Sequence, residues 1–186
     1  IRRQRQMCIR DRYKVSSPTK DKLETLSNLL CSFEDQSTIV FLNYRDSVER
    51  TADYLKRRGF SVSHFHGGMD QKEREDALYK FSNGSANVFV STDLASRGLD
   101  IPDVDNIIHY HLPQTEDNYI HRVGRTARWE ADGQAFFVLG PEEHIPEFVK
   151  DNIKSIDIPD NGKTPVAAKM ATIYICLLYT SDAADE

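Results

Sequence analysis

Short apolar segments alternate with segments of helical spacing along most of the chain. Residues 38–42, Thr-Ile-Val-Phe-Leu, are typical of a strand buried on both faces. Residues 45–58 follow with helical spacing, in which Val48 and Leu55 share one face. This helix is expected to end at Gly59, because glycine readily adopts the backbone conformation that terminates helices. Such an alternation favours a parallel sheet over an antiparallel one.

The alternation continues on both sides of this pair. Asp70 is expected to begin a helix, because Glu73 three residues later completes a capping box. Further strands are expected over residues 60–65, 87–91, 106–110 and 134–139, and further helices over residues 18–33, 70–81, 116–125 and 141–151. The predicted fold class is therefore α/β, a parallel sheet with helices on both faces. Ligands bind at the carboxyl ends of the strands in such sheets.

The two ends of the chain are related to each other through the genetic code. One choice of codons for residues 6–12 reads Cys-Leu-Leu-Tyr-Thr-Ser on the complementary strand, which is the sequence of residues 176–181. Natural termini do not produce such an inverted repeat, whereas a translated sequencing adapter resembles one. Residues 1–12 and 176–186 are therefore interpreted as artefacts, and residues 13–158 as one domain.

Charge and cysteine content limit the class of protein. Residues 1–12 carry a net charge of +4 and residues 176–186 a net charge of −3, so excluding both ends changes the formal net charge from −5 to −6. Because dedicated nucleic-acid-binding domains are often basic, any nucleic-acid contact must use a local patch and backbone amides, or another domain of a larger protein shares the binding. Cys31 is then the one remaining cysteine, which favours core packing and a reduced, cytoplasmic protein. No apolar run approaches the roughly 20 residues that span a bilayer, so no membrane contact is expected.

Residues 121–128, His-Arg-Val-Gly-Arg-Thr-Ala-Arg, form the first of two polar motifs. Arg122, Arg125 and Arg128 are spaced three residues apart, which places them on one broad helical face. The planar guanidinium group matches the geometry of phosphate oxygens, so this face is suited to grip phosphate. A solvated basic turn is the alternative interpretation.

The second motif, residues 91–102, follows a predicted strand. It combines hydroxyl side chains, Gly98 and acidic residues, and such a loop offers backbone N–H groups and a hydroxyl to phosphates. The alternative is an ordinary turn in which Asp93 or Asp100 caps a helix.

Together, residues 91–102 and 121–128 resemble motifs V and VI of the DEAD-box RNA helicases, in order and at the expected spacing. Residues 66–74 resemble the family's H-G-x-x-x-Q-x-x-R element, and residues 39–45 resemble its motif IV. Over residues 13–158 the resemblance implies the second RecA-like domain of an ATP-dependent RNA helicase. The complete protein would couple ATP binding and hydrolysis to local unwinding of RNA duplexes.

The resemblance implies three sets of site residues. Arg125 and Arg128 would be the arginine fingers that reach the γ-phosphate of ATP. It implies ATP binding by Gly98, Asp100, Arg125 and Arg128, interdomain contacts by Arg97, His121 and Arg122, and RNA contacts by Arg45, Gly67, Gln71, Arg74 and Thr92. For Gln71 and Arg74, an exposed polar helix face is the alternative. Glu130 stands where the family usually has Gly, so the turn after the motif is expected to differ.

The resemblance also implies cofactors and partners. They are ATP, Mg²⁺ held by the first RecA-like domain, that domain itself, and RNA. The phosphate-binding loop and the D-E-A-D stretch belong to that other domain and do not occur in this sequence. His64 and His66 have no further Cys or His at metal-site spacing, so this chain is expected to hold no metal.

Residues 159–175 are interpreted as a linker and the start of a further domain. Residues 169–175 are similar to the opening of the RNA-binding domain of DbpA-type bacterial helicases. Two other functions stay open for the whole chain. One is a DNA-directed helicase with the same core, and the other is a non-enzymatic interaction module.

Overall fold

The computed structural model describes residues 9–126, 133–149 and 153–157 of the chain. The strands are β1 (Ile9–Ser16), β2 (Thr38–Leu42), β3 (Val62–Phe65), β4 (Val88–Thr92), β5 (Asn106–His109), β6 (Gly133–Leu139) and β7 (Lys154–Ser155). The α-helices are α1 (Leu23–Cys31), α2 (Arg45–Arg57), α3 (Gln71–Ser82), α4 (Asp93–Ser96) and α5 (Glu116–Val123), and a 3₁₀ helix covers Gly124–Thr126.

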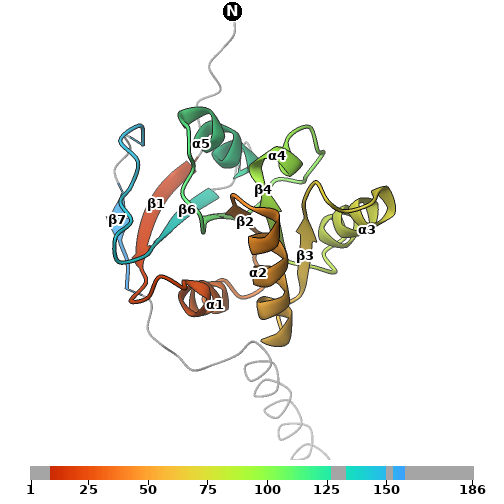
Figure 1. Ribbon diagram of the computed structural model, residues 1–186, viewed down its shortest axis with the longest axis horizontal. Coiled ribbons are helices and arrows are strands. Elements are labelled where there is room, and N and C mark those ends of the chain that lie inside the picture. Colours follow the sequence, from red (N-terminus) through yellow and green to blue (C-terminus); the bar gives the residue numbers. More distant parts are fainter. Residues whose placement is uncertain (1–8, 127–132, 150–152, 158–186) are drawn as a thin grey trace, which may run out of the picture.

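The strands form one twisted parallel sheet in the order β3-β4-β2-β5-β6-β1-β7 (Figure 1). Every pair of neighbouring strands within the described residues is parallel. The parallel α/β sheet predicted from the sequence is therefore confirmed. The carboxyl ends of all these strands lie at one edge, because parallel strands run in the same direction.

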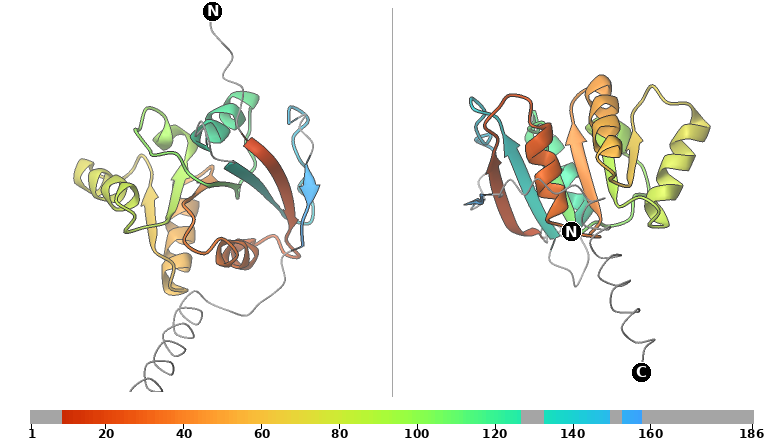
Figure 2. Two further views of the ribbon diagram at one scale, coloured as in Figure 1. Left: turned by 180° about the vertical axis from the view of Figure 1, so that it is seen from behind. Right: turned by 90° about the horizontal axis from the view of Figure 1, so that it is seen from below.

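Helices cover both faces of the sheet. In β2, Val40 and Leu42 pack on the face of α1 and α2, whereas Ile39 and Phe41 pack on the opposite face, against α3. Helix α5 packs on that second face, against β6. Figure 2 shows α1 and α2 together on one side of the sheet. Since side chains alternate along a strand, the wholly apolar β2 is explained by a sheet buried on both faces.

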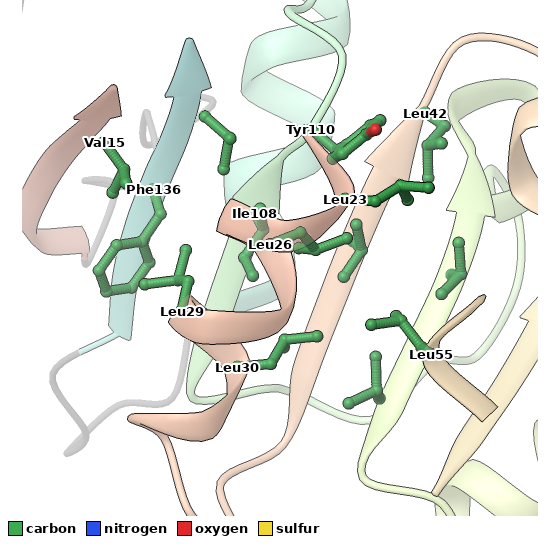
Figure 3. Close-up of a cluster of buried hydrophobic side chains, with 14 of the residues drawn as sticks. Val15, Leu23, Leu26, Leu29, Leu30, Leu42, Leu55, Ile108, Tyr110 and Phe136 are labelled. Atoms are coloured by element: carbon green, nitrogen blue, oxygen red, sulfur yellow. The ribbon is translucent and has the colours of Figure 1, made fainter. Parts of the chain in front are cut away.

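The apolar face of α1 fills one of the two cores. Leu23, Leu26, Leu29 and Leu30 point from the helix toward the sheet, where Figure 3 shows them among strand residues that include Phe136. Leu26 is completely buried, and a leucine in such a place contributes about 1.5–3 kcal/mol through removal of its surface from water. The expected leading helix is confirmed, but it is shorter than predicted and begins at Leu23.

The helix predicted over residues 141–151 is wrong. The described part of this segment, residues 140–149, holds turns in which Glu143 N–H donates to the Gly140 carbonyl and Val149 N–H to the Pro146 carbonyl. Pro146 is the physical reason, because it lacks an N–H and disfavours helical geometry at the residue before it. The prediction took Pro141 as a helix start and neglected the second proline.

Strand β1 was not predicted, because its first residues were assigned to the terminal repeat. It begins at Ile9 and pairs along its whole length with β6, from Gly133 to Leu139. Backbone pairing does not depend on side-chain identity, so an added segment continues a strand as readily as a native one. The expected domain boundary at residue 13 therefore stays a prediction.

Candidate functional site

A groove of about 820 Å³ lies at the carboxyl ends of β2, β3 and β4. Figure 1 shows α3 and α4 beside β3 and β4, and residues of both helices line the groove. Among its lining residues are all five predicted RNA contacts, Arg45, Gly67, Gln71, Arg74 and Thr92, together with Arg97. The structure therefore brings together residues from three separate motifs, as the strand order of a parallel sheet allows.

Arg74 is fixed at one wall of this groove. Asp70 and Glu73 form the predicted capping box at the start of α3, which sets the direction of the helix. From the next turn, Arg74 donates to the Gly67 carbonyl at 2.8 Å and lies over the Phe65 ring at 5.9 Å. Both contacts hold the guanidinium group over the end of β3. The Arg74 side chain is thus positioned before any ligand arrives.

Thr92 and Arg97 come from the loop that follows β4. The Thr92 hydroxyl accepts from the Ala95 N–H and caps the short helix α4, so this loop has a local cap, but Thr92 provides it rather than Asp93 or Asp100. Arg97 donates to Asp117 at 2.7 Å and to Asn118 at 2.9 Å, both on α5. This ties the loop to α5 within the same domain. Gly98 follows with φ of 75°, a conformation that side chains other than glycine adopt with strain.

Arg122 lies inside the domain, at the carboxyl ends of the strands. Its side chain is fully buried, and each of its five N–H groups faces an acceptor in this domain. Asp93 receives two of them at 2.6 and 2.7 Å, Asn43 one at 3.0 Å, and the His111 carbonyl one at 2.7 Å, while His109 Nδ1 lies at 3.3 Å. Within this domain Arg122 therefore joins the carboxyl ends of three strands to α5, and its contact with another domain stays a prediction.

Burial from water and the Arg122 charge lower the pKa values of two neighbouring imidazoles, those of His109 and His111. Burial, and then the Arg122 charge, lowers the pKa of His109 well below its usual value. For His111, burial and then the Lys22 charge lower the pKa to about 4. His111 Nδ1 accepts from the Asn43 N–H at 3.0 Å, which requires the neutral ring. Both rings are neutral at physiological pH and act here as structural acceptors.

Arg125 is attached to the loop after β4. It donates to the Leu99 carbonyl at 3.0 Å and to the Ser96 carbonyl at 2.9 Å, while its side chain stays half-buried. Asp100 and Gly98 on that loop are exposed, as is His121, whose Nε2 lies 3.4 Å from Asp117. The predicted ATP-facing residues Gly98, Asp100 and Arg125 are thus joined in one unit. Arg128 and Glu130 lie outside the described residues.

Sequence reasoning missed three residues of this region. Asp93 binds Arg122, Asn43 connects β2 to it, and Glu75 lines the groove beside Gln71. Asp93 stood inside a recognised motif, but its burial beside an arginine is a tertiary property. Glu75 falls four residues after Gln71, and this helical spacing was the available signal.

Two further kinds of function find no support in the described ranges. No three His, Cys, Asp or Glu side chains there are grouped so that they could bind a metal ion. In the same ranges, every helix is too short or too polar to cross a membrane.

Comparison with known proteins identifies the family. Residues 21–130 match the family described as Helicase conserved C-terminal domain. The rice DEAD-box ATP-dependent RNA helicase 21 is 40% identical over 151 residues, which are 81% of this chain and 20% of the rice protein. The chain therefore spans about a fifth of that relative.

Solved structures show the same fold. The Escherichia coli DEAD-box protein SrmB, in a complex with regulator of ribonuclease activity A, superimposes with a TM-score of 0.71 at 30% identity, over 78% of this chain and 89% of that chain. A DEAD box protein from Methanococcus jannaschii gives a TM-score of 0.68 at 26% identity, over 78% and 42% of the two chains. The chain belongs to the DEAD-box proteins, as a helicase conserved C-terminal domain with the RecA-like fold.

Proposed function

We propose that this chain is the second RecA-like domain of an ATP-dependent RNA helicase, in which ATP binding and hydrolysis drive local unwinding of RNA duplexes. The groove carries this proposal. It gathers Arg45, Arg74 and Arg97 with the amide of Gln71 and the exposed backbone at Gly67. Cationic forks, an amide and exposed backbone are the groups that bind the sugar-phosphate backbone of a nucleic acid. The surrounding domain is acidic, so binding is confined to this patch.

The loop after β4 also supports a role in ATP hydrolysis, because Arg125 donates to two of its carbonyls. Each terminal nitrogen of Arg125 carries two hydrogens, and one of each is donated to a loop carbonyl. The second hydrogens are suited to the oxygens of a γ-phosphate. Asp100 is an exposed acceptor for a ribose hydroxyl, and the exposed Gly98 allows close approach of the nucleotide. These residues fit the nucleotide that the family implies.

The mechanism requires the first RecA-like domain as a partner. That domain would hold Mg²⁺, which neutralises charge on the phosphates. In the closed arrangement Arg125 and Arg128 would donate to the γ-phosphate as its bond to the leaving oxygen breaks, and so stabilise the developing charge. His121 and Arg97 are exposed, and both contact Asp117. They would contact the first domain. Arg122 would act indirectly, since it holds the loop and α5 together.

The proposal extends to location and to the C-terminal segment. The protein would act in the cytoplasm, in line with Cys31 as the one cysteine of residues 13–175. Residues 159–175 would lead into an additional RNA-binding domain. The DNA-directed helicase and the non-enzymatic module are the competing functions, and the groove by itself is compatible with either class of nucleic acid.

Substitution of Arg125 tests the enzymatic part. In a complete protein that includes both RecA-like domains, Arg125→Ala is expected to lower RNA-stimulated ATP hydrolysis by about 10³-fold or more, because it removes transition-state donors. RNA binding, measured by fluorescence anisotropy, is expected to change little. Arg57→Ala serves as the control, since Arg57 is exposed at the end of α2 and lies outside the groove. Unchanged hydrolysis in Arg125→Ala would refute the finger role.

A further inference from the structure

Glu75 is an unexpected side chain in a groove built for a polyanion. It lines the groove together with Arg45 and Arg74, and it is exposed. In the described part of the chain Glu75 accepts a hydrogen bond from a neutral group, the Gln71 amide, with 2.8 Å between Gln71 Nε2 and Glu75 Oε1. A carboxylate there repels phosphate, so charge attraction to the nucleic acid does not explain its presence.

The contact determines how the Gln71 amide is oriented. An ionised carboxylate accepts hydrogen bonds and cannot donate, so the atom of Gln71 that faces Glu75 must be nitrogen. The amide carbonyl is therefore turned away from Glu75. Gln71 itself lines the groove at the first turn of α3, one turn before Glu75. The pair leaves the Gln71 carbonyl as an acceptor with a fixed direction, together with the second Nε2 hydrogen, for whatever lies beside Gln71.

An acceptor selects a particular group of a nucleic acid. Phosphate oxygens have no hydrogen to donate to this carbonyl, and the Glu75 carboxylate repels a phosphate that approaches the remaining Nε2 hydrogen. The ribose 2′-hydroxyl is a donor on the backbone of RNA, and DNA lacks it. We propose that Glu75 orients the Gln71 carbonyl to accept a hydrogen bond from a ribose 2′-hydroxyl, so that this pair selects RNA over DNA. The inference rests on the proposed nucleic-acid-binding function of the groove.

The role of the Gln71–Glu75 pair is tested by comparing the binding of two single strands that differ only in the 2′ group. The whole chain is titrated at low salt with a fluorescent oligouridylate and with its 2′-fluoro counterpart, which keeps the sugar pucker but cannot donate. The unsubstituted protein is expected to prefer the 2′-hydroxyl strand by about threefold to tenfold, as one hydrogen bond provides. Glu75→Ala is expected to reduce this preference toward one, because the amide is then free to rotate.

Two variants separate orientation from charge. Glu75→Gln removes the charge but keeps an acceptor for Gln71, so it is expected to retain the preference while both strands bind more tightly. Asp76→Asn removes the same charge from the same helix at an exposed position outside the groove, and it is expected to leave the preference unchanged. Because Glu75 and Asp76 are both exposed, these variants are expected to fold normally, which circular dichroism checks.

The outcomes distinguish the inference from the proposed function. A preference that is equal in the unsubstituted protein and in Glu75→Ala would overturn the role of the pair, while RNA binding by the groove would stand. Binding of both strands without any preference would have the same meaning. Failure of the unsubstituted chain to bind either strand would overturn the proposed function of the groove, and the inference with it.

Discussion

At the scale of single residues, the buried Arg122 is the most consequential side chain of the site. Its ion pair with Asp93 is shielded from water, since the Arg122 side chain is 0% and the Asp93 side chain 17% exposed. Asp93→Ala would leave the guanidinium buried without its counter-charge, and we expect a loss of about 3–5 kcal/mol in the free energy of unfolding. Urea denaturation measures this loss.

A surface ion pair provides the comparison for that prediction. Asp117 pairs with Arg97 at 2.7 Å, but its side chain is 65% exposed. We expect Asp117→Ala to cost about 1 kcal/mol or less, because solvent screens such a pair. Equal losses for Asp93→Ala and Asp117→Ala would show that the burial of Arg122 adds nothing to stability.

His111 makes the stability of the fold depend on pH. Its pKa is about 4 in the folded protein and near 6.5 in the unfolded chain, so the unfolded chain binds the extra proton as the pH falls. The stability that neutral His111 provides is thus complete above pH 6.5 and is lost between pH 6.5 and 4. For a half-buried ring we expect about 1–2 kcal/mol of this loss.

The measurement is the midpoint of urea unfolding at several pH values across that window. His111→Asn keeps an acceptor for the Asn43 N–H but does not titrate there. This variant is expected to show a smaller loss of stability toward low pH than the unsubstituted protein. Identical pH profiles of the two proteins would contradict the prediction, and the pH dependence would then come from other groups such as His109.

At the scale of elements, the first residue of β6 constrains the turn that carries Arg125. A Cβ atom added to Gly133 would lie 2.4 Å from the Thr126 Cβ, a distance that real side chains do not reach. We expect Gly133→Ala to destabilise the domain by about 1–3 kcal/mol and to displace the 3₁₀ helix Gly124–Thr126. Thermal unfolding measures the first effect, and amide chemical shifts of the helix measure the second.

Gly124 is the matched control for this substitution. Its φ is −64°, and an added Cβ would meet no atom within 4 Å. Gly124→Ala is therefore expected to leave the thermal stability nearly unchanged, although it narrows the space available to a partner at that surface. A Gly133→Ala variant as stable as Gly124→Ala would show that the Thr126 contact relaxes without cost.

The elements also show which parts of the structure the sequence predicts and which it does not. The apolar β2 and the amphipathic α2 follow from local patterns. An unbroken apolar run predicts a strand buried on both faces, and helical spacing of apolar residues predicts a helix buried on one face. The resemblance named the RNA-contact residues, and they line one groove because they follow parallel strands that end at one edge. The buried position of Arg122 was not, because charge normally indicates exposure and its acceptors come from residues distant in sequence.

Distance along the sequence also explains why the contacts of Lys22 with residues toward the carboxyl end of the chain were not predicted. Lys22 is buried, and its ammonium group donates to the carbonyls of Tyr110 and Val138 and to Glu143 at 2.6 Å. These partners lie 88 to 121 residues away, so no local pattern reveals them. Burial lowers the pKa of Lys22, while the Glu143 carboxylate opposes that effect. The Lys22–Glu143 ion pair stabilises the turn after β6, where the sequence predicted a helix over residues 141–151.

At the scale of the whole molecule, the described part of an acidic domain carries a cationic groove. Overall repulsion makes non-specific attachment of a nucleic acid weak, so the salt dependence of binding reports on the groove itself. If Arg45 and Arg74 each neutralise a phosphate of a single strand, the logarithm of the affinity should fall with the logarithm of salt with a slope of about −1.4. Arg45→Ala is expected to reduce the magnitude of this slope by about 0.7, and Arg57→Ala outside the groove is expected to leave it unchanged. Equal slopes in both variants would place the nucleic acid on another surface, because a charge that releases no counterion does not contact the strand.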